Sequence, residues 1–317
     1  MSKILVIAET SGSDLTVSTL EVCQAASILS TSLGENWKIL VHDCAVEAAG
    51  KVAPEVVPFS LSEDTHQGAE LVASIAAQVA KSADVVVMAA TSTGKDVMGR
   101  LAQRLSTALA QDCMGFEVDS NEIVFKRALY GGKVVAGVKL SGKPMLASFR
   151  PRSFTSIAQS GGFAEVVAHT VNSVTPRTNI NLQAKAGSKR PDVTDASIVV
   201  SGGRGLQGPE NWSILEDLLD ALGPNAALAC SRPVSDDHWR PHSEHVGQTG
   251  RAIAPDLYIA VGISGATQHV AGIAGSKCIL AINKDLDAPI FKVADYGIVG
   301  DLFEVVPALT AAIRDAA

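Results

Sequence analysis

The residues that could bind an anionic ligand are concentrated in the second half of this 317-residue chain. Residues 203–208 form a G-x-G-x-x-G pattern that follows an apolar run and precedes an amphipathic one. In that setting, backbone N–H groups and a helix N-terminus can bind a pyrophosphate, although a tight turn that requires glycine gives the same pattern. A nicotinamide site also needs an Asp or Glu at the end of the next strand. That strand ends at Cys230, Ser231 and Arg232, which disfavours NAD.

Two further loops are rich in glycine and in side chains that can donate hydrogen bonds. Residues 246–250 read Val-Gly-Gln-Thr-Gly, and residues 262–269 read Gly-Ile-Ser-Gly-Ala-Thr-Gln-His. In a doubly wound sheet, ligands lie over the carboxyl ends of the strands. We therefore expect residues 201–204, 231–232 and 262–269 to converge on one site. Their two arginines and one histidine suit an anionic ligand larger than a single phosphate.

The elements that must position these loops alternate between short β-branched runs and longer runs of helical period. This alternation predicts an α/β protein with a largely parallel sheet. We expect strands at residues 4–8, 37–41, 84–89, 197–200, 226–230, 256–261 and 279–282. We expect helices at 15–33, closed by Gly34, at 68–81, from 91–95 to about 110, at 210–222, at 268–275 and from 302 onward.

The chain is long enough for two domains. Residues 116–149 alternate around Gly131-Gly132 and Ser141-Gly142, which predicts hairpins added to the first sheet. Residues 172–195 are polar and lack an apolar period, as a domain boundary does. We therefore expect an N-terminal, nucleotide-binding-like α/β domain over 1–185 and a C-terminal, doubly wound, parallel-sheet domain over 186–317.

Composition excludes several other classes of protein. The chain carries 26 Lys and Arg against 33 Asp and Glu, a formal net charge of −7, which argues against a nucleic-acid partner. No apolar run approaches the roughly 20 residues that span a bilayer, so we expect no direct membrane insertion. The five cysteines are scattered and form no C-x-x-C pair, which suits a reducing compartment. The N-terminus reads straight into a strand, so we expect a cytoplasmic protein without a signal or transit peptide.

Several of these motifs together resemble a known family. Residues 255–307 are similar to the C-terminal half of the alpha (large) subunit of electron-transfer flavoproteins. SGGRGL at 201–206, Ser231-Arg232 and VGQTG at 246–250 match that family in order and spacing. The resemblance is looser over 1–185, where ILVIAE and TSTGKD fit the N-terminal domain. It implies a non-covalent FAD held mostly by the C-terminal domain.

The resemblance also implies a role for individual residues. Arg204 and Ser231 would meet the dinucleotide, Arg232 would lie against the isoalloxazine ring, and Thr249 would face its N5 edge. His269 would lie near the C2 carbonyl, whereas Asn283 and the pair at 301–302 would bind toward the adenosine end. The full set of expected cofactor-binding residues is Arg204, Ser231, Arg232, Val246, Gly247, Gln248, Thr249, Ser264, Gly265, Ala266, Thr267, Gln268, His269, Asn283, Asp301 and Leu302.

A one-electron carrier must stabilise a flavin semiquinone whose negative charge gathers near N1 and the C2 carbonyl. A cation or a hydrogen-bond donor at that place favours the reduced forms. A charge-assisted hydrogen bond is worth about 1.5–3 kcal/mol, or roughly 65–130 mV for one electron. We expect Arg232 and His269 to supply it, since the protein contributes position and electrostatics while the flavin contributes the redox chemistry.

The function that the resemblance implies is an electron carrier rather than an enzyme with a substrate reaction of its own. Electrons would come from flavin dehydrogenases, such as the acyl-CoA dehydrogenases of fatty acid β-oxidation, and pass to a membrane quinone oxidoreductase. The obligate partner would be the beta subunit, which holds AMP in many members. One alternative is the alpha subunit of an electron-bifurcating, NADH-linked flavoprotein. Another, of a different class, is an NAD-dependent enzyme or a nucleotide-binding module.

Two further segments carry chemistry-bearing residues. Residues 233–245 contain His238, His242 and His245 beside Asp236 and Asp237, which by type could bind a metal ion. The segment lacks the helical spacing of paired ligands, so we predict a solvated loop and no metal site. Residues 91–95, Thr-Ser-Thr-Gly-Lys, lack the upstream glycine of a P-loop and predict a helix start.

Overall fold

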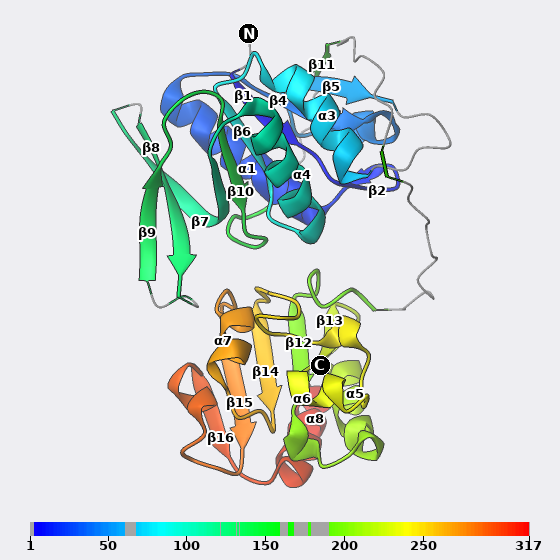
Figure 1. The fold of residues 1–317 in the computed structure, drawn as a ribbon. Helices are drawn as coiled ribbons and strands as arrows, with labels where there is room; N and C mark the ends of the chain where they lie inside the picture. Colours follow the sequence, from blue (N-terminus) through cyan, green and yellow to red (C-terminus); the bar gives the residue numbers. More distant parts are fainter. Residues whose placement is uncertain are drawn as a thin grey trace. The chain divides into compact units, whose positions relative to one another are not determined.

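A computed structural model describes residues 3–60, 68–120, 122–130, 132, 134–158, 164–167, 177–178 and 190–316. The chain forms two compact units: unit 1 holds residues 1–129 and 133–183, and unit 2 holds 130–132 and 184–317 (Figure 1). Each unit has its own sheet, which confirms the two-domain α/β prediction. Most of the segment predicted as the boundary, residues 172–195, lies outside the described residues.

Unit 1 is built on a nine-stranded sheet with the order β11-β5-β4-β1-β6-β10-β7-β8-β9. Its strands are β1 (Ile4–Ile7), β4 (Trp37–His42), β5 (Glu55–Phe59), β6 (Val85–Ala89), β7 (Leu109–Asp119), β8 (Glu122–Leu129), β9 (Val134–Lys139), β10 (Met145–Phe149) and β11 (Glu165–Val166). The pairs β7–β8 and β8–β9 are antiparallel, and the other neighbours are parallel. Strands β1 and β6 are buried throughout, which explains their continuous apolar sequences.

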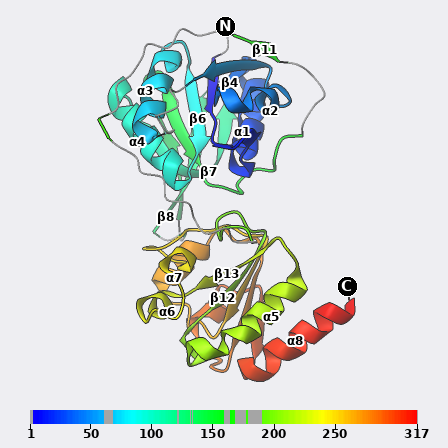
Figure 2. The same ribbon diagram turned by 90° about the vertical axis from the view of Figure 1, so that its right-hand side faces the viewer.

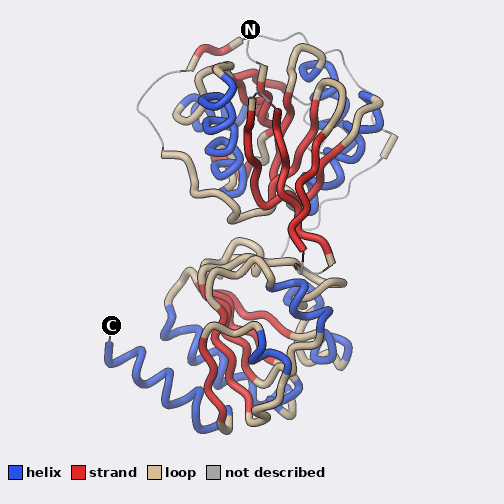
Figure 3. Tube along the Cα trace, turned by 90° about the vertical axis from the view of Figure 1, so that its left-hand side faces the viewer, coloured by secondary structure: helices blue, strands red, loops and turns tan. Residues whose placement is uncertain are grey.

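Helices cover both faces of this sheet (Figure 3). They are α1 (Val17–Leu33), α2 (Val46–Gly50), α3 (Ala69–Ala80) and α4 (Ser92–Leu105), with a 3₁₀ turn at Asp43–Ala45 and a small hairpin of β2 (Thr10–Ser11) and β3 (Asp14–Leu15). Apolar residues of α1 pack with one face of β1, and those of α3 and α4 pack with the other. Helix α1 ends at Gly34 with a φ of 65°, and Thr91 caps α4 by accepting a hydrogen bond from the Gly94 N–H at 2.9 Å, both as predicted.

One of the two predicted hairpins is present, and the prediction of the other is wrong. Strands β8 and β9 pair antiparallel; of the predicted turn Gly131-Gly132, Gly131 lies outside the described residues. The strand after Ser141-Gly142, β10, does not pair with β9 but lies parallel between β6 and β7. Its last four residues are buried, so it gains more by entering the sheet than by extending a hairpin. Helix α4 ends at Leu105 rather than near 110, because β7 begins at Leu109.

Unit 2 contains a five-stranded parallel sheet with the order β13-β12-β14-β15-β16. The strands are β12 (Ile198–Gly202), β13 (Ala226–Cys230), β14 (Leu257–Val261), β15 (Ile279–Asn283) and β16 (Tyr296–Val299). The helices are α5 (Ser213–Leu222), α6 (Arg232–Asp236), α7 (Thr267–Ile273) and α8 (Leu302–Ala316). Helices α5 and α8 cover one face and α7 covers the other, which confirms the doubly wound prediction (Figure 2).

Several elements were not predicted: α2, α6, β5, β11, β16 and the small β2–β3 hairpin. Strand β5 contains Pro58, and β16 is a short, exposed edge strand with Gly297, so neither has a strong strand pattern. Helix α6 is five residues long and begins Arg-Pro, too short to show a helical period. Among the described residues, no helix combines the length and the apolar character needed to cross a membrane.

Candidate functional site

The site predicted from sequence lies at the carboxyl edge of the sheet in unit 2. Strand β12 has β13 on one side and β14 on the other, so the order of the strands reverses there. Ligands of doubly wound sheets bind at such a switch point. The expected cofactor-binding residues, apart from 246–249, lie at or directly after the carboxyl ends of β12, β13, β14, β15 and β16. The parallel sheet therefore brings together segments that are far apart in the sequence.

Three glycines bind the loops after β12 and β14 to each other. A Cβ on Gly203 would lie 2.2 Å from the Gly262 carbonyl oxygen, and one on Gly205 would lie 2.7 Å from the Gly262 Cα. The N–H of Gly205 donates to the Gly262 carbonyl oxygen at 3.1 Å. The sequence predicted a helix from residue 210, which is wrong at its start: the glycine motif forms a 3₁₀ turn at Arg204–Leu206, a second 3₁₀ turn follows at Pro209–Trp212, and α5 begins only at Ser213. The glycines thus permit close loop contact and do not place a helix N-terminus at the motif.

The loop at 246–250 joins the same edge, although no strand leads directly into it. The N–H of Val246 donates to the Cys230 carbonyl oxygen at 3.0 Å, at the end of β13. The N–H of Gln248 donates to the Gln268 carbonyl oxygen at 2.8 Å, on α7. A Cβ on Gly272 would lie 2.5 Å from the Gly247 Cα. Gln248 and the adjacent Thr249 remain exposed, so their side chains are accessible to a ligand.

Two predicted cations lie at this edge with accessible guanidinium groups. Arg204 is exposed at the start of the 3₁₀ turn after β12. Arg232 begins α6, is 63% exposed, and pairs with Asp236 at 3.2 Å. The neighbouring Ser231 is buried at the N-cap of α6, and its N–H donates to the Gly202 carbonyl oxygen at 3.0 Å. Because the Arg232–Asp236 pair is exposed, it stabilises the fold little and leaves the cation available to an anion.

The turn that precedes α7 is held by a second close backbone approach. Gly265 has a φ of 81°, and a Cβ there would lie 2.3 Å from the Ile290 nitrogen. The N–H of Ile290 donates to the Ser264 carbonyl oxygen at 3.0 Å. Ser264, Ala266, Thr267 and Gln268 are all exposed on this turn and the first residues of α7. The turn thus presents four of the predicted residues on a rigid base.

His269 differs from its neighbours because it is buried. Its Nε2 lies 2.7 Å from the hydroxyl oxygen of Tyr258, a fully buried residue of β14. Burial lowers the pKa of His269 to about 4, so the imidazole is neutral at physiological pH. Its Nδ1 is buried and forms no hydrogen bond of regular geometry within the described chain. The sequence analysis did not single out Tyr258 as a residue of the site. The signal that could have indicated it is its hydroxyl group, the one polar side-chain group in the strand Leu-Tyr-Ile-Ala-Val.

The residues expected at the adenosine end form hydrogen bonds or core contacts within the protein. The side-chain amide of Asn283 donates to the Ile263 carbonyl oxygen at 3.0 Å and accepts from the Asp285 N–H at 3.1 Å. A carboxylate oxygen of Asp301 accepts from the Phe303 N–H at 2.9 Å, in the first turn of α8. Leu302 is buried in the core. Their contact with a ligand therefore stays a prediction, while their role in shaping the loops is visible.

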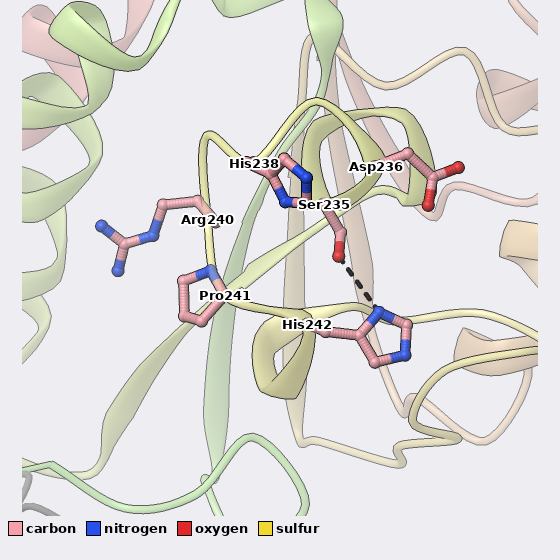
Figure 4. A pocket seen from close by; sticks show the side chains of 6 residues that line it. All are labelled: Ser235, Asp236, His238, Arg240, Pro241 and His242. Atoms are coloured by element: carbon pink, nitrogen blue, oxygen red, sulfur yellow. Dashed lines mark hydrogen bonds between the residues drawn. The ribbon is translucent and has the colours of Figure 1, made fainter.

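The histidine-bearing segment forms an open pocket beside α6 (Figure 4). Within it, the Ser235 hydroxyl lies 3.2 Å from His242 Nδ1, and Arg240 turns away to bind Glu244 at 2.7 Å. His245 is buried rather than solvated, and that burial lowers its pKa. In the part of the chain that the structure describes, no three His, Cys, Asp or Glu side chains lie close enough to hold a metal ion.

The chemistry of this edge is that of binding. It offers two exposed guanidinium groups, several loops fixed by glycine contacts and two buried imidazoles, those of His245 and His269, each with an Nδ1 that forms no hydrogen bond within the described residues. Burial raises the pKa of the Cys230 thiol to about 12, so it is not a thiolate nucleophile. These residues fit an anionic dinucleotide that carries a heterocycle with a carbonyl group. A doubly wound sheet with its loops gathered at a switch point is the arrangement typical of nucleotide-binding domains.

Comparison with known proteins identifies the family. Residues 4–174 match the electron transfer flavoprotein domain, and residues 192–274 match the electron transfer flavoprotein FAD-binding domain. The electron transfer flavoprotein subunit alpha of Pseudomonas aeruginosa is 40% identical over 98% of this chain and 99% of that protein. Those of Bacillus subtilis and Syntrophomonas wolfei are 36% and 38% identical, over 97% and 90% of this chain and 96% and 90% of theirs. The chain belongs to the electron transfer flavoprotein alpha-subunit family, whose FAD-binding domain makes FAD its cofactor.

Proposed function

We propose that this chain is the FAD-binding subunit of a heterodimeric electron carrier and that FAD lies along the carboxyl edge of the unit 2 sheet. The observation that carries the proposal is the backbone contact of Gly203 and Gly205 with Gly262, which fixes the loops on both sides of the switch point. Accessible Arg204 and Arg232 flank these loops and can balance the charge of the diphosphate and of the reduced ring. FAD supplies the redox chemistry when bound, and the chain supplies position and electrostatics.

Each predicted side chain then has a proposed place. Arg204 and Ser231 bind the diphosphate, and Arg232 lies against the isoalloxazine ring. Thr249 faces the N5 edge, and His269 offers a hydrogen bond to the C2 carbonyl. The residues from 264 to 268 line the ring and the diphosphate, whereas Asn283, Asp301 and Leu302 lie toward the adenosine. The exposed positions of the two arginines and the unbonded Nδ1 of His269 support these assignments.

We further propose that residues 1–185 form the domain that packs against a beta subunit and that residues 186–317 form the FAD domain. Strand β9 is an edge strand of the unit 1 sheet, and its Val134 and Val135 are 48% and 53% exposed. Exposed apolar side chains on an unpaired edge favour a protein partner. The proposed redox partners are acyl-CoA-type dehydrogenases as donors and a membrane quinone oxidoreductase as acceptor, with electrons transferred one at a time.

The test is co-expression of this chain with its beta subunit, followed by an FAD assay and a stepwise reductive titration of the heterodimer. One FAD per heterodimer, reduced by an acyl-CoA dehydrogenase and its substrate but not by NADH, supports the proposal. Two FAD per heterodimer, one of them reduced directly by NADH, would instead establish a bifurcating flavoprotein. A colourless heterodimer that retains NAD would overturn the site as proposed.

A further inference from the structure

Tyr258 and His269 form a buried polar pair beneath the proposed ring position. Tyr258 is 0% exposed and His269 is 7% exposed, and the Tyr258 hydroxyl oxygen lies 2.7 Å from His269 Nε2. Tyr258 is the largest fully buried side chain in the described structure. A buried tyrosine hydroxyl costs stability unless it is hydrogen-bonded, and His269 supplies that bond.

The sheet leaves room for this arrangement. Tyr258 and Ala260 point to the same face of β14, because side chains alternate along a strand. Ala260 is aligned with Ala281 on β15, and both belong to the same buried cluster as Tyr258. These small side chains let the phenol ring extend along the sheet toward the carboxyl edge. There its hydroxyl group meets His269, the third residue of α7.

The hydrogen-bonding capacities of the two groups decide which of them donates. Burial raises the pKa of Tyr258, so the hydroxyl keeps its single hydrogen. Neutral His269 has one N–H and one lone pair. Among the described residues, the Tyr258 hydroxyl forms its hydrogen bond of regular geometry with His269 Nε2. If Nε2 carried the hydrogen, the buried hydroxyl hydrogen would be left without this acceptor, which costs stability. Donation from the Tyr258 hydroxyl to Nε2 satisfies both groups.

We propose that Tyr258 is a positioning residue: its hydroxyl donates to Nε2 of His269 and so holds the imidazole hydrogen on Nδ1, the nitrogen left for the cofactor. The partner of one ring nitrogen sets which tautomer the other presents. With the hydrogen on Nδ1, the ring presents a donor to a carbonyl group. With the hydrogen on Nε2, it would present a lone pair and repel that carbonyl. The hydrogen bond from Nδ1 to the cofactor rests on the proposed function, whereas the position of the hydrogen on the imidazole ring does not.

The experiment uses the FAD-loaded heterodimer with ¹⁵N-labelled histidine. Three forms are compared: wild type, Tyr258→Phe, which removes only the hydroxyl group, and Tyr296→Phe as the matched control on an exposed tyrosine. The His269 signals are assigned by their loss in His269→Gln. We expect the Nδ1–H tautomer in wild type and in the control, and a mixture of tautomers in Tyr258→Phe. We also expect Tyr258→Phe to lower the equilibrium constant for uptake of the first electron by FAD threefold to tenfold. This change corresponds to a reduction potential that is about 30–59 mV lower.

The outcomes separate this inference from the proposed function. Hydrogen on Nε2 in wild type overturns the role of Tyr258, and this measurement stands even if Tyr258→Phe does not fold. An unchanged tautomer and an unchanged potential in a folded Tyr258→Phe heterodimer overturn it as well. If removal of FAD does not move the His269 signals, the proposed cofactor site fails, while the tautomer still decides what Tyr258 does.

Discussion

The backbone of Gly203 packs directly against that of Gly262: a Cβ on Gly203 would lie 2.2 Å from the Gly262 carbonyl oxygen, so position 203 has no room for a larger side chain. The two residues belong to loops that follow neighbouring strands, β12 and β14. The requirement at Gly203 is space rather than backbone conformation, because its φ of −113° is open to any residue. The contact therefore ties the glycine motif to the tertiary structure of the site.

Gly203→Ala should force these two loops apart. We expect a loss of roughly 1–3 kcal/mol in the free energy of unfolding, typical of overpacking, together with a lower FAD content. Urea unfolding and the ratio of flavin to protein measure the two effects. The matched control is Gly99→Ala in α4, where a Cβ would meet nothing within 4 Å. That change should stabilise the helix by about 0.5–1 kcal/mol. Equal stability and FAD content in wild type and Gly203→Ala would contradict the role given to this contact.

Acid should destabilise the protein through His269. Its pKa is lowered by burial from 6.5 to about 4, so between these values the unfolded chain binds a proton that the folded chain does not. The contribution of neutral His269 to the free energy of unfolding is complete above pH 6.5 and is lost as the pH falls toward 4. The total loss is about 3 kcal/mol, because each unit of pKa difference corresponds to about 1.4 kcal/mol. Urea unfolding over this range should show a smaller loss in His269→Gln than in wild type. Parallel pH dependences in the two proteins would show that His269 does not titrate in this way.

Arg232→Ala should lower the reduction potential of the bound flavin. The Arg232 side chain is 63% exposed and, within the described residues, pairs with the exposed Asp236, so it can act on the reduced ring without cost to the fold. The loss of one charge-assisted interaction corresponds to roughly 65–130 mV. Redox titration of the heterodimer measures the change, with Arg314→Ala, an exposed side chain of α8, as the control. If both substitutions leave the potential unchanged, Arg232 does not contact the ring.

Asn283 should prove to be a structural as well as a binding residue. Its amide joins the loop after β14, through Ile263, to the turn at Asp285. Asn283→Ala should therefore cost about 1 kcal/mol of stability. Asn283→Asp should cost at least as much, because it places a second acceptor against the Ile263 carbonyl. Both variants should release FAD faster, whereas Asn225→Ala, at an exposed position before β13, should change neither property. Faster FAD release with unchanged unfolding would assign Asn283 to binding alone.

The sequence predicted much of the fold because its signals are local. Apolar runs such as Ile4–Ile7 and Val85–Ala89 are buried on both sides and can be read as parallel strands without knowing their neighbours. The Thr91 cap is equally local. The placement of β10 between β6 and β7 was not predicted, because the choice between a hairpin and insertion depends on which partner strand buries more apolar surface.

For the site, the sequence by itself determined the residue types, their order along the chain and the glycines at each loop, and these were enough to indicate the family and FAD. Only the tertiary structure decided how those residues act. It showed that the glycine motif contacts Gly262 and leaves α5 to begin at Ser213, that Asn283 already bonds two loops, and that Tyr258 lies against His269. The physical reason is that these contacts join strands distant in sequence, and burial, which sets the charge of His269, exists only after the sheet has formed.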